Sequence, residues 1–152
     1  MPYNEEDITN EIAAQERAIA GVKASFDYAR NPDSLTANLL PAVIHFIPSF
    51  TAEVRGHHNV WKNDITVQSV VFVMPRESQG GKLRFIENAA IPYGQKWRTR
   101  FQTESVITTL LQNTGAVRAF LTGGDYGAGG PLLTFGAVEY IGWTMTFSFL
   151  SA

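Results

Sequence analysis

The stretch Glu139-Tyr-Ile-Gly-Trp-Thr-Met-Thr-Phe-Ser-Phe-Leu150 decides the fold of this chain. In its second half an apolar side chain alternates with threonine or serine at every position, and this period of two is typical of a strand with one buried face. Trp143, Met145, Phe147 and Phe149 form the predicted buried face. A strand this regular has to be held in a sheet, so the search for its partners works outward from here.

Further strands are predicted by short apolar or alternating runs on the N-terminal side of this stretch. Residues 117–122 and 132–137 form two strands, joined by the glycine-dense stretch 123–131. Earlier in the chain, residues 42–47 form a strand. Residues 50–56 are either a second strand or a bent continuation of the first. Residues 60–74 alternate at first and then become apolar on both faces, which indicates a strand that ends in the buried middle of a sheet.

Two amphipathic helices are predicted, over about residues 5–29 and 95–112. Asn4 is a suitable N-cap for the first helix. The second is introduced by Pro92-Tyr93-Gly94 and closed by Asn113-Thr-Gly115, which has the pattern of a glycine C-cap. The order predicts an α+β fold, a mostly antiparallel sheet flanked by two helices, in a single domain over residues 1–152.

Charge is scarce, and the shortage is regional. Charged residues make up 17% of the 152 residues, against about 25% in ordinary soluble domains, and the net charge is −2. Only Arg118, Asp125 and Glu139 are charged between residues 105 and 152. Interface cores are depleted in charge and enriched in aromatic residues. We therefore expect this third of the chain to be largely buried, in the core or against other subunits.

One basic segment interrupts an otherwise acidic chain. Residues 76–104 hold six basic side chains against three acidic ones, and residues 76–91 form a long charged loop of a length that is often functional. Aromatic residues interleave with the basic ones, and such an arrangement can bind nucleic acid. Trp97 and Phe101, however, are better explained as residues of the hydrophobic core. The basic contact candidates are Arg76, Lys82, Arg84, Lys96, Arg98 and Arg100.

Motifs for catalysis, metal binding or cofactor binding are not found, and the protein is not expected to be an enzyme. The chain has no cysteine, which excludes disulfides and thiolate chemistry. Of the three histidines, His57 and His58 are interpreted as surface residues of a turn, and His45 lies in a predicted strand. Most carboxylates are interpreted as solvated charges of the first helix. The glycine-rich stretch 123–131 lacks the spacing of a dinucleotide loop and is interpreted as an adaptable hairpin tip with positive-φ glycines. Its contact candidates are Gly124, Asp125, Tyr126 and Gly127.

The pattern of elements resembles a known family, the tail terminator (tail-completion or head–tail joining) proteins of long-tailed bacteriophages. The features that carry the resemblance are spread over most of the chain. They are the N-terminal amphipathic helix, the run Leu40-Pro-Ala-Val-Ile-His-Phe, the strand Ile65–Met74, the helix opened by Pro92-Tyr93-Gly94, and the closing Gly136-Ala-Val-Glu-Tyr-Ile-Gly-Trp-Thr-Met-Thr-Phe-Ser-Phe. They match in order and length, without a signature motif.

The resemblance implies a non-enzymatic virion protein of the tail or neck, assembled in the host cytoplasm, without cofactor or membrane. Such proteins form hexameric rings that cap the finished tail tube and join it to the head. The implied partners are further copies of the chain, the tail tube protein, and a neck or connector protein. The loops 76–91 and 123–131 are then contact arms. The basic residues then contact an acidic neighbour or the DNA that passes through the channel. Alternatively, the channel wall is acidic so that it does not hold the DNA, and Glu5, Glu6 and Glu11 are then the candidates to line it.

Two other interpretations stay open at the level of sequence. One is a different virion part, such as a tube, neck or baseplate protein. The other comes from a different class, a small-ligand-binding or enzymatic α+β barrel with a pocket lined by Trp143, Phe147 and Phe149. Packing of these three side chains against the helices would argue against such a pocket.

Overall fold

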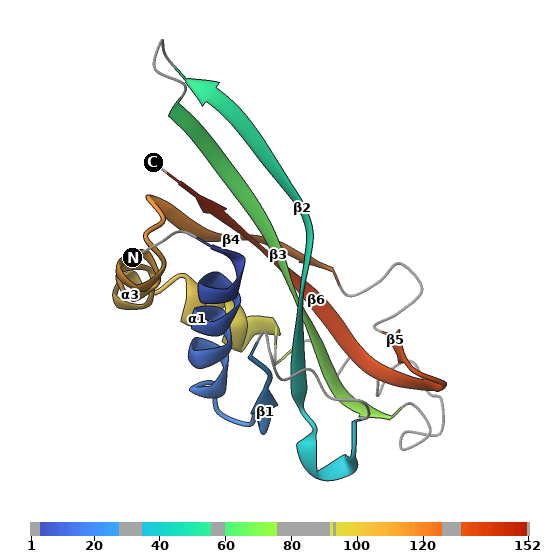
Figure 1. Cartoon of the computed structure of the whole chain (residues 1–152). Coiled ribbons are helices and arrows are strands. Elements are labelled where there is room, and N and C mark those ends of the chain that lie inside the picture. The colour runs from blue at the N-terminus through green and yellow to red at the C-terminus, as the bar shows by residue number, and fades with distance from the viewer. Residues whose placement is uncertain are drawn as a thin grey trace.

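A twisted sheet forms the frame of the protein, and the helices lie on one face of it (Figure 1). The computed structural model describes residues 4–27, 35–55, 60–75, 92, 94–125 and 132–151. The strand order is β1-β2-β3-β6-β4, with β5 paired to β6, and only the short β1 runs parallel to its neighbour. The predicted α+β fold with a mostly antiparallel sheet is confirmed.

The longest strands are β2 (Ala42–Arg55) and β3 (Val60–Pro75), which pair as a hairpin. β2 is continuous, so residues 50–55 are the continuation of the first strand considered above, and Gly56 lies outside the described residues. Its register with β3 shifts between Phe46 and Ser49, where Pro48 cannot donate a backbone hydrogen bond. β3 pairs with β6 (Val138–Leu150), and the other edge of β6 pairs with β4 (Arg118–Asp125) and β5 (Leu132–Phe135).

The first helix is shorter than the predicted 5–29. α1 spans Glu5–Arg17, and the Asn4 side chain caps it by accepting from the Asp7 amide at 2.8 Å. Gly21, with a φ of 95°, ends any continuation, because this backbone conformation cannot belong to a right-handed helix. Of the later apolar residues of the pattern, Ile19 and Val22 lie between α1 and β1 (Ala24–Ser25), and Phe26 follows β1.

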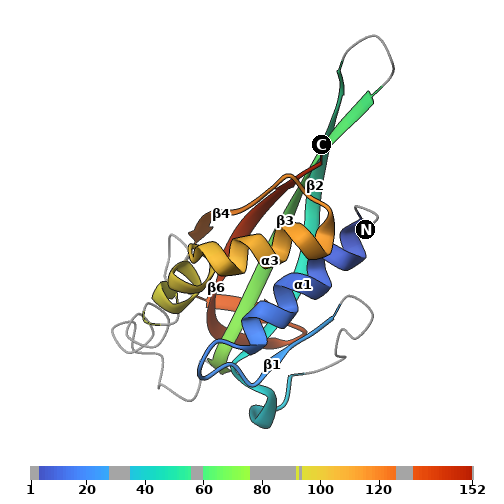
Figure 2. The same cartoon turned by 90° about the vertical axis from the view of Figure 1, so that its left-hand side faces the viewer.

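The second predicted helix, 95–112, is two helices. Residues 94–101 form the first, and α3 (Glu104–Thr114) forms the second, with Thr103 as its N-cap and Gly115 as its left-handed C-cap. The break shifts the helical phase, so Val106 and Leu110 are buried while Glu104 is exposed. Figure 2 shows α1 and α3 lying across the same face of the sheet.

The main core lies between this helical layer and the sheet. All four side chains predicted for the buried face of β6 are at most 2% exposed. Trp97 meets Trp143 edge to face with ring centroids 5.6 Å apart, and Phe101 meets Phe147 at 4.7 Å. A smaller cluster packs on the opposite sheet face near β5, from Leu35, Leu40, Ala42, Ile44, Phe72 and Tyr140.

The glycines at the start of the stretch 123–131 do not form a loop. Gly123 and Gly124 belong to β4, and neither has a positive φ. A Cβ at Gly124 would lie 2.7 Å from the Met145 Sδ, so close packing against β6 favours glycine there. Residues 126–131 and the predicted loop 76–91 lie outside the described residues.

Candidate functional site

A buried carboxylate joins the helical layer to the sheet. Glu16 of α1 is 0% exposed. Its Oε2 accepts from Trp97 Nε1 at 2.7 Å, and its Oε1 accepts from the Ser25 hydroxyl at 3.3 Å. The same Oε1 contacts His45 Nε2, and Nδ1 of that ring lies 3.1 Å from the Phe26 carbonyl. This polar network therefore links α1, β1, β2 and the helix over residues 94–101.

The donor and acceptor inventory fixes how the network is built. The Phe26 carbonyl can only accept, so Nδ1 of His45 carries a proton. With both carboxylate oxygens and both ring nitrogens engaged, the network serves to hold the elements together.

Sequence reasoning did not single out these two residues. His45 was expected in a strand and is 8% exposed, and Glu16 is buried although most carboxylates of the first helix were interpreted as solvated. A signal was present for Glu16. It follows Ile8 and Ile12 at steps of four, so it lies on the apolar stripe of the helix, where a carboxylate needs partners.

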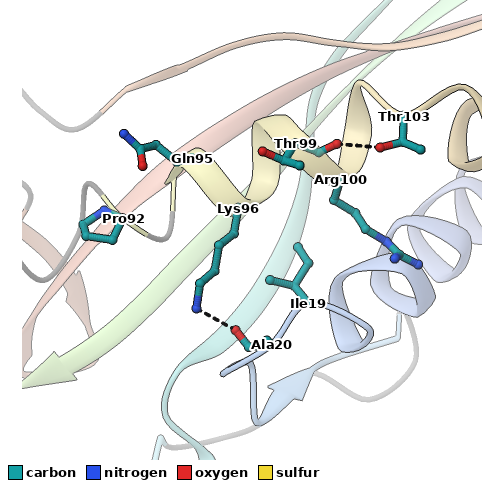
Figure 3. A pocket seen from close by; sticks show the side chains of 8 residues that line it. All are labelled: Ile19, Ala20, Pro92, Gln95, Lys96, Thr99, Arg100 and Thr103. Carbon is teal, nitrogen blue, oxygen red and sulfur yellow. Dashed lines mark hydrogen bonds between the residues drawn. The ribbon is translucent and has the colours of Figure 1, made fainter.

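A shallow groove of about 600 Å³ lies between the end of α1 and the helix over residues 94–101 (Figure 3). Lys96 Nζ donates across it to the Ala20 carbonyl at 3.0 Å. Arg100 donates from Nε and Nη2 to Gln15 Oε1, at 3.2 and 2.7 Å. These two cations therefore fasten one helix to the other.

The six basic candidates divide into three groups. Lys96 and Arg100 are four residues apart on one helix face and lie together at the groove, while Arg98 is exposed on another face. Arg76, Lys82 and Arg84 lie outside the described residues. Among the glycine-loop candidates, Gly124 and Asp125 lie exposed at the end of β4, and Tyr126 and Gly127 lie outside the described residues.

The sheet surface opposite the helices, which we call the outer face, is free of charge over two consecutive rows. Phe46 pairs with Gln68 and Gln68 with Thr146, and in the next row Thr66 pairs with Ser148 and Ser148 with Phe120. Phe46 and Phe120 are 50% and 44% exposed. α1, the helix over residues 94–101 and α3 lie on the opposite side (Figures 1 and 2). The outer face is defined by Phe46, Thr66, Gln68, Phe120, Thr146 and Ser148.

The far half of the β2–β3 hairpin, residues 50–55 and 60–65, projects beyond the helical layer and is called the ribbon (Figure 1). Its helix-side face is apolar apart from Asn63, which lies opposite Ala52. Phe50 is 65% exposed, and Val54 and Trp61, which are paired across the strands, are 45% and 57% exposed. Sequence patterning placed these residues in strands but gave no sign that their apolar side is uncovered.

Catalytic or metal chemistry has little support in the described residues. No group of three or more histidine, aspartate or glutamate side chains gathers there as a metal site. Trp143, Phe147 and Phe149 are at most 1% exposed and pack against the helices, which argues against the ligand pocket considered above. Among the described helices, none is long and apolar enough to span a membrane.

Comparison with known proteins leaves the family unassigned. No family model matches the chain, and no curated protein matches it.

Proposed function

We propose that the protein is a structural subunit of a bacteriophage tail, a terminator that forms a ring on the head-proximal end of the tail tube. The ring ends tube polymerisation and joins the tail to the head or neck. The proposal rests first on the resemblance in element order and length, which the chain's α+β architecture fits.

The observation that carries the proposal is the outer face. A sheet face that is meant for water usually carries lysine, arginine, glutamate or aspartate, whereas this one carries threonine, serine, glutamine and two exposed phenylalanines. Depletion of charge with aromatic enrichment is the compositional mark of an interface core. An assembly subunit needs such a surface, and a free monomer does not.

The chemistry of the other features agrees with a non-enzymatic role. The buried carboxylate and histidine satisfy one another, and the groove cations are engaged with α1. Lys96 and Arg100 therefore have a structural role, and of the described contact candidates Arg98 is the exposed basic side chain that could meet an acidic neighbour or DNA.

The experiment is a measurement of mass and shape. Light scattering on purified protein, followed by negative-stain images, is expected to give a closed oligomer of about six subunits. Tail tubes purified from the encoding phage should bind the protein at one end. A protein that stays monomeric at high concentration and does not bind these tubes would overturn the proposal.

A further inference from the structure

The ribbon is amphipathic, and its apolar side is exposed to solvent. Phe50 and Ile65 are paired across the strands on the helix side, yet Ile65 is 4% exposed and Phe50 is 65% exposed. The helical cover therefore ends within this row. Farther out, the paired Val54 and Trp61 continue the apolar face of the core into solvent.

The other side of the ribbon is polar. Glu53 lies opposite Lys62, and Thr51 lies opposite Asp64. That side can therefore be solvated. On the apolar side, one exposed strip is formed by Phe50, Ala52, Val54 and Trp61. An exposed apolar strip on a projecting element marks an interaction site.

We propose that the apolar side of the ribbon of one copy lies on the outer face of the next copy. This inference rests on the proposed ring and names the contact that builds it. The outer face has no charged side chain in its two rows, so an apolar ribbon meets uncharged residues there. Asp64, which accepts from the Ser148 hydroxyl at 2.6 Å, and Arg118 border these rows and would form the charged rim of the contact.

A contact between these two surfaces has to join two copies. The ribbon's apolar side looks toward the helix side of the sheet and the outer face looks away from it, so neither can cover the other within one chain. Each copy then presents one donor surface and one acceptor surface. A contact of this kind is head-to-tail, and it closes into a ring when the rotation between copies allows it.

The size of the surfaces suits such a contact. Aromatic side chains bury roughly 150–250 Å² each, so covering the strip removes on the order of 300–400 Å² of apolar surface. This is about half of the roughly 800 Å² per partner of a stable interface, and the polar residues around the strip would have to supply the rest.

The test uses the absence of cysteine from the natural sequence. In the double variant V54C/T146C, a disulfide can form only between copies. Trp61, the partner of Val54, is seven residues along β3 from Gln68, the partner of Thr146 (68 − 61 = 7). That distance is about 23 Å, far beyond the reach of about 7 Å between the Cα atoms of a disulfide.

Under mild oxidation, the double variant is expected to give a ladder on non-reducing gels that ends at the ring size. Mixing the single variants V54C and T146C, or V54C and Q68C, should give a dimer band. The matched control is V54C with T108C, which places the second thiol on the exposed helix side of α3, and it should give at least tenfold less product.

Each result decides the question. Disulfides only between two V54C chains would mean that ribbons pair symmetrically, and would overturn the inference. An assembly with no V54C–T146C or V54C–Q68C product would overturn the contact and leave the ring proposal intact. A monomer without any cross-link would overturn both.

A second measurement does not depend on disulfide geometry. V54K places a charge on the strip and should weaken self-association at least about tenfold. V138K is the matched control, since Val138 is also 45% exposed but lies next to the β5–β6 turn, far from the ribbon. Equal effects of both variants, with circular dichroism showing both folded, would overturn the inference.

Discussion

At the residue scale, the most consequential side chain is Glu16. It accepts from Trp97 and Ser25 and contacts His45, although these residues are 9 to 81 positions away in sequence. Removing a buried carboxylate leaves every donor around it without an acceptor. An unsatisfied buried donor lowers the stability by more than one hydrogen bond contributes to it. The stability of a variant at position 16 should therefore depend on whether the new side chain can accept and donate hydrogen bonds.

E16L is expected to lower the free energy of unfolding by about 3–5 kcal/mol, the range for breaking a buried pair. E16Q should cost much less, about 1–2 kcal/mol, because the amide oxygen still accepts from Trp97 and the amide nitrogen can donate to His45 Nε2. Urea unfolding followed by tryptophan fluorescence measures both. Equal losses for the two variants would show that the hydrogen bonds contribute little.

Ser69 is the opposite case, a buried hydroxyl whose Oγ has no hydrogen-bond partner in the described part of the chain. S69A should leave stability unchanged or raise it by up to about 1 kcal/mol, since it removes an unsatisfied polar atom from the core. T114V is the control, because the Thr114 hydroxyl donates to the Leu110 carbonyl at 2.6 Å and its loss should destabilise. A clear loss of stability in S69A by thermal unfolding would contradict this.

At the scale of elements, β6 was the most predictable part and the helices the least. The alternation with a period of two from Trp143 to Phe149 can be recognised without knowing the partners of the strand, and the structure buries the predicted side. The caps at Asn4 and Gly115 are local as well, and both are confirmed. The end of α1 was missed because Ile19 and Val22 fit helical spacing while packing against the core from a turn.

The break at Gln102 and Thr103 was missed for a similar reason. Apolar residues continue on both sides of it, and only the shift of phase from Phe101 to Val106 distinguishes two helices from one. The basic pair at the groove could be placed on one helix from sequence. Its contacts with α1 depend on tertiary packing, and so does the exposure of the ribbon.

Glycines give the sharpest prediction at this scale. A Cβ at Gly142 would lie 1.9 Å from the Val71 carbonyl oxygen, so G142A must push β6 away from β3, and it should cost at least about 2 kcal/mol. G123A is the control, because a Cβ there meets nothing within 4 Å, and it should be neutral or slightly stabilising. Chemical denaturation of the two variants measures the difference, and similar stabilities would contradict the tight β3–β6 approach.

At the scale of the whole molecule, the shortage of charged residues can be assigned to particular surfaces of the C-terminal third. Buried residues account for the alternate positions of β6, as expected, but β4 is largely exposed. In the outer face beside it, Phe46 and Phe120 are exposed and the other residues are half-buried. The C-terminal third is therefore only half buried within the subunit. The expectation that its remaining surface is covered by other subunits is part of the proposed assembly.

Salt separates the two ways in which this molecule could associate. If the ribbon and the outer face form the contact, few charges meet, and raising sodium chloride from about 50 mM to about 500 mM should leave the mass by light scattering unchanged or slightly increased. If the basic segment with Arg98 carried the association through an acidic neighbouring surface, the same change would dissociate the assembly. R98E is the control, since charge reversal on an exposed residue should leave an apolar contact intact. Dissociation by salt together with loss of association in R98E would place the subunit contact on the basic helix.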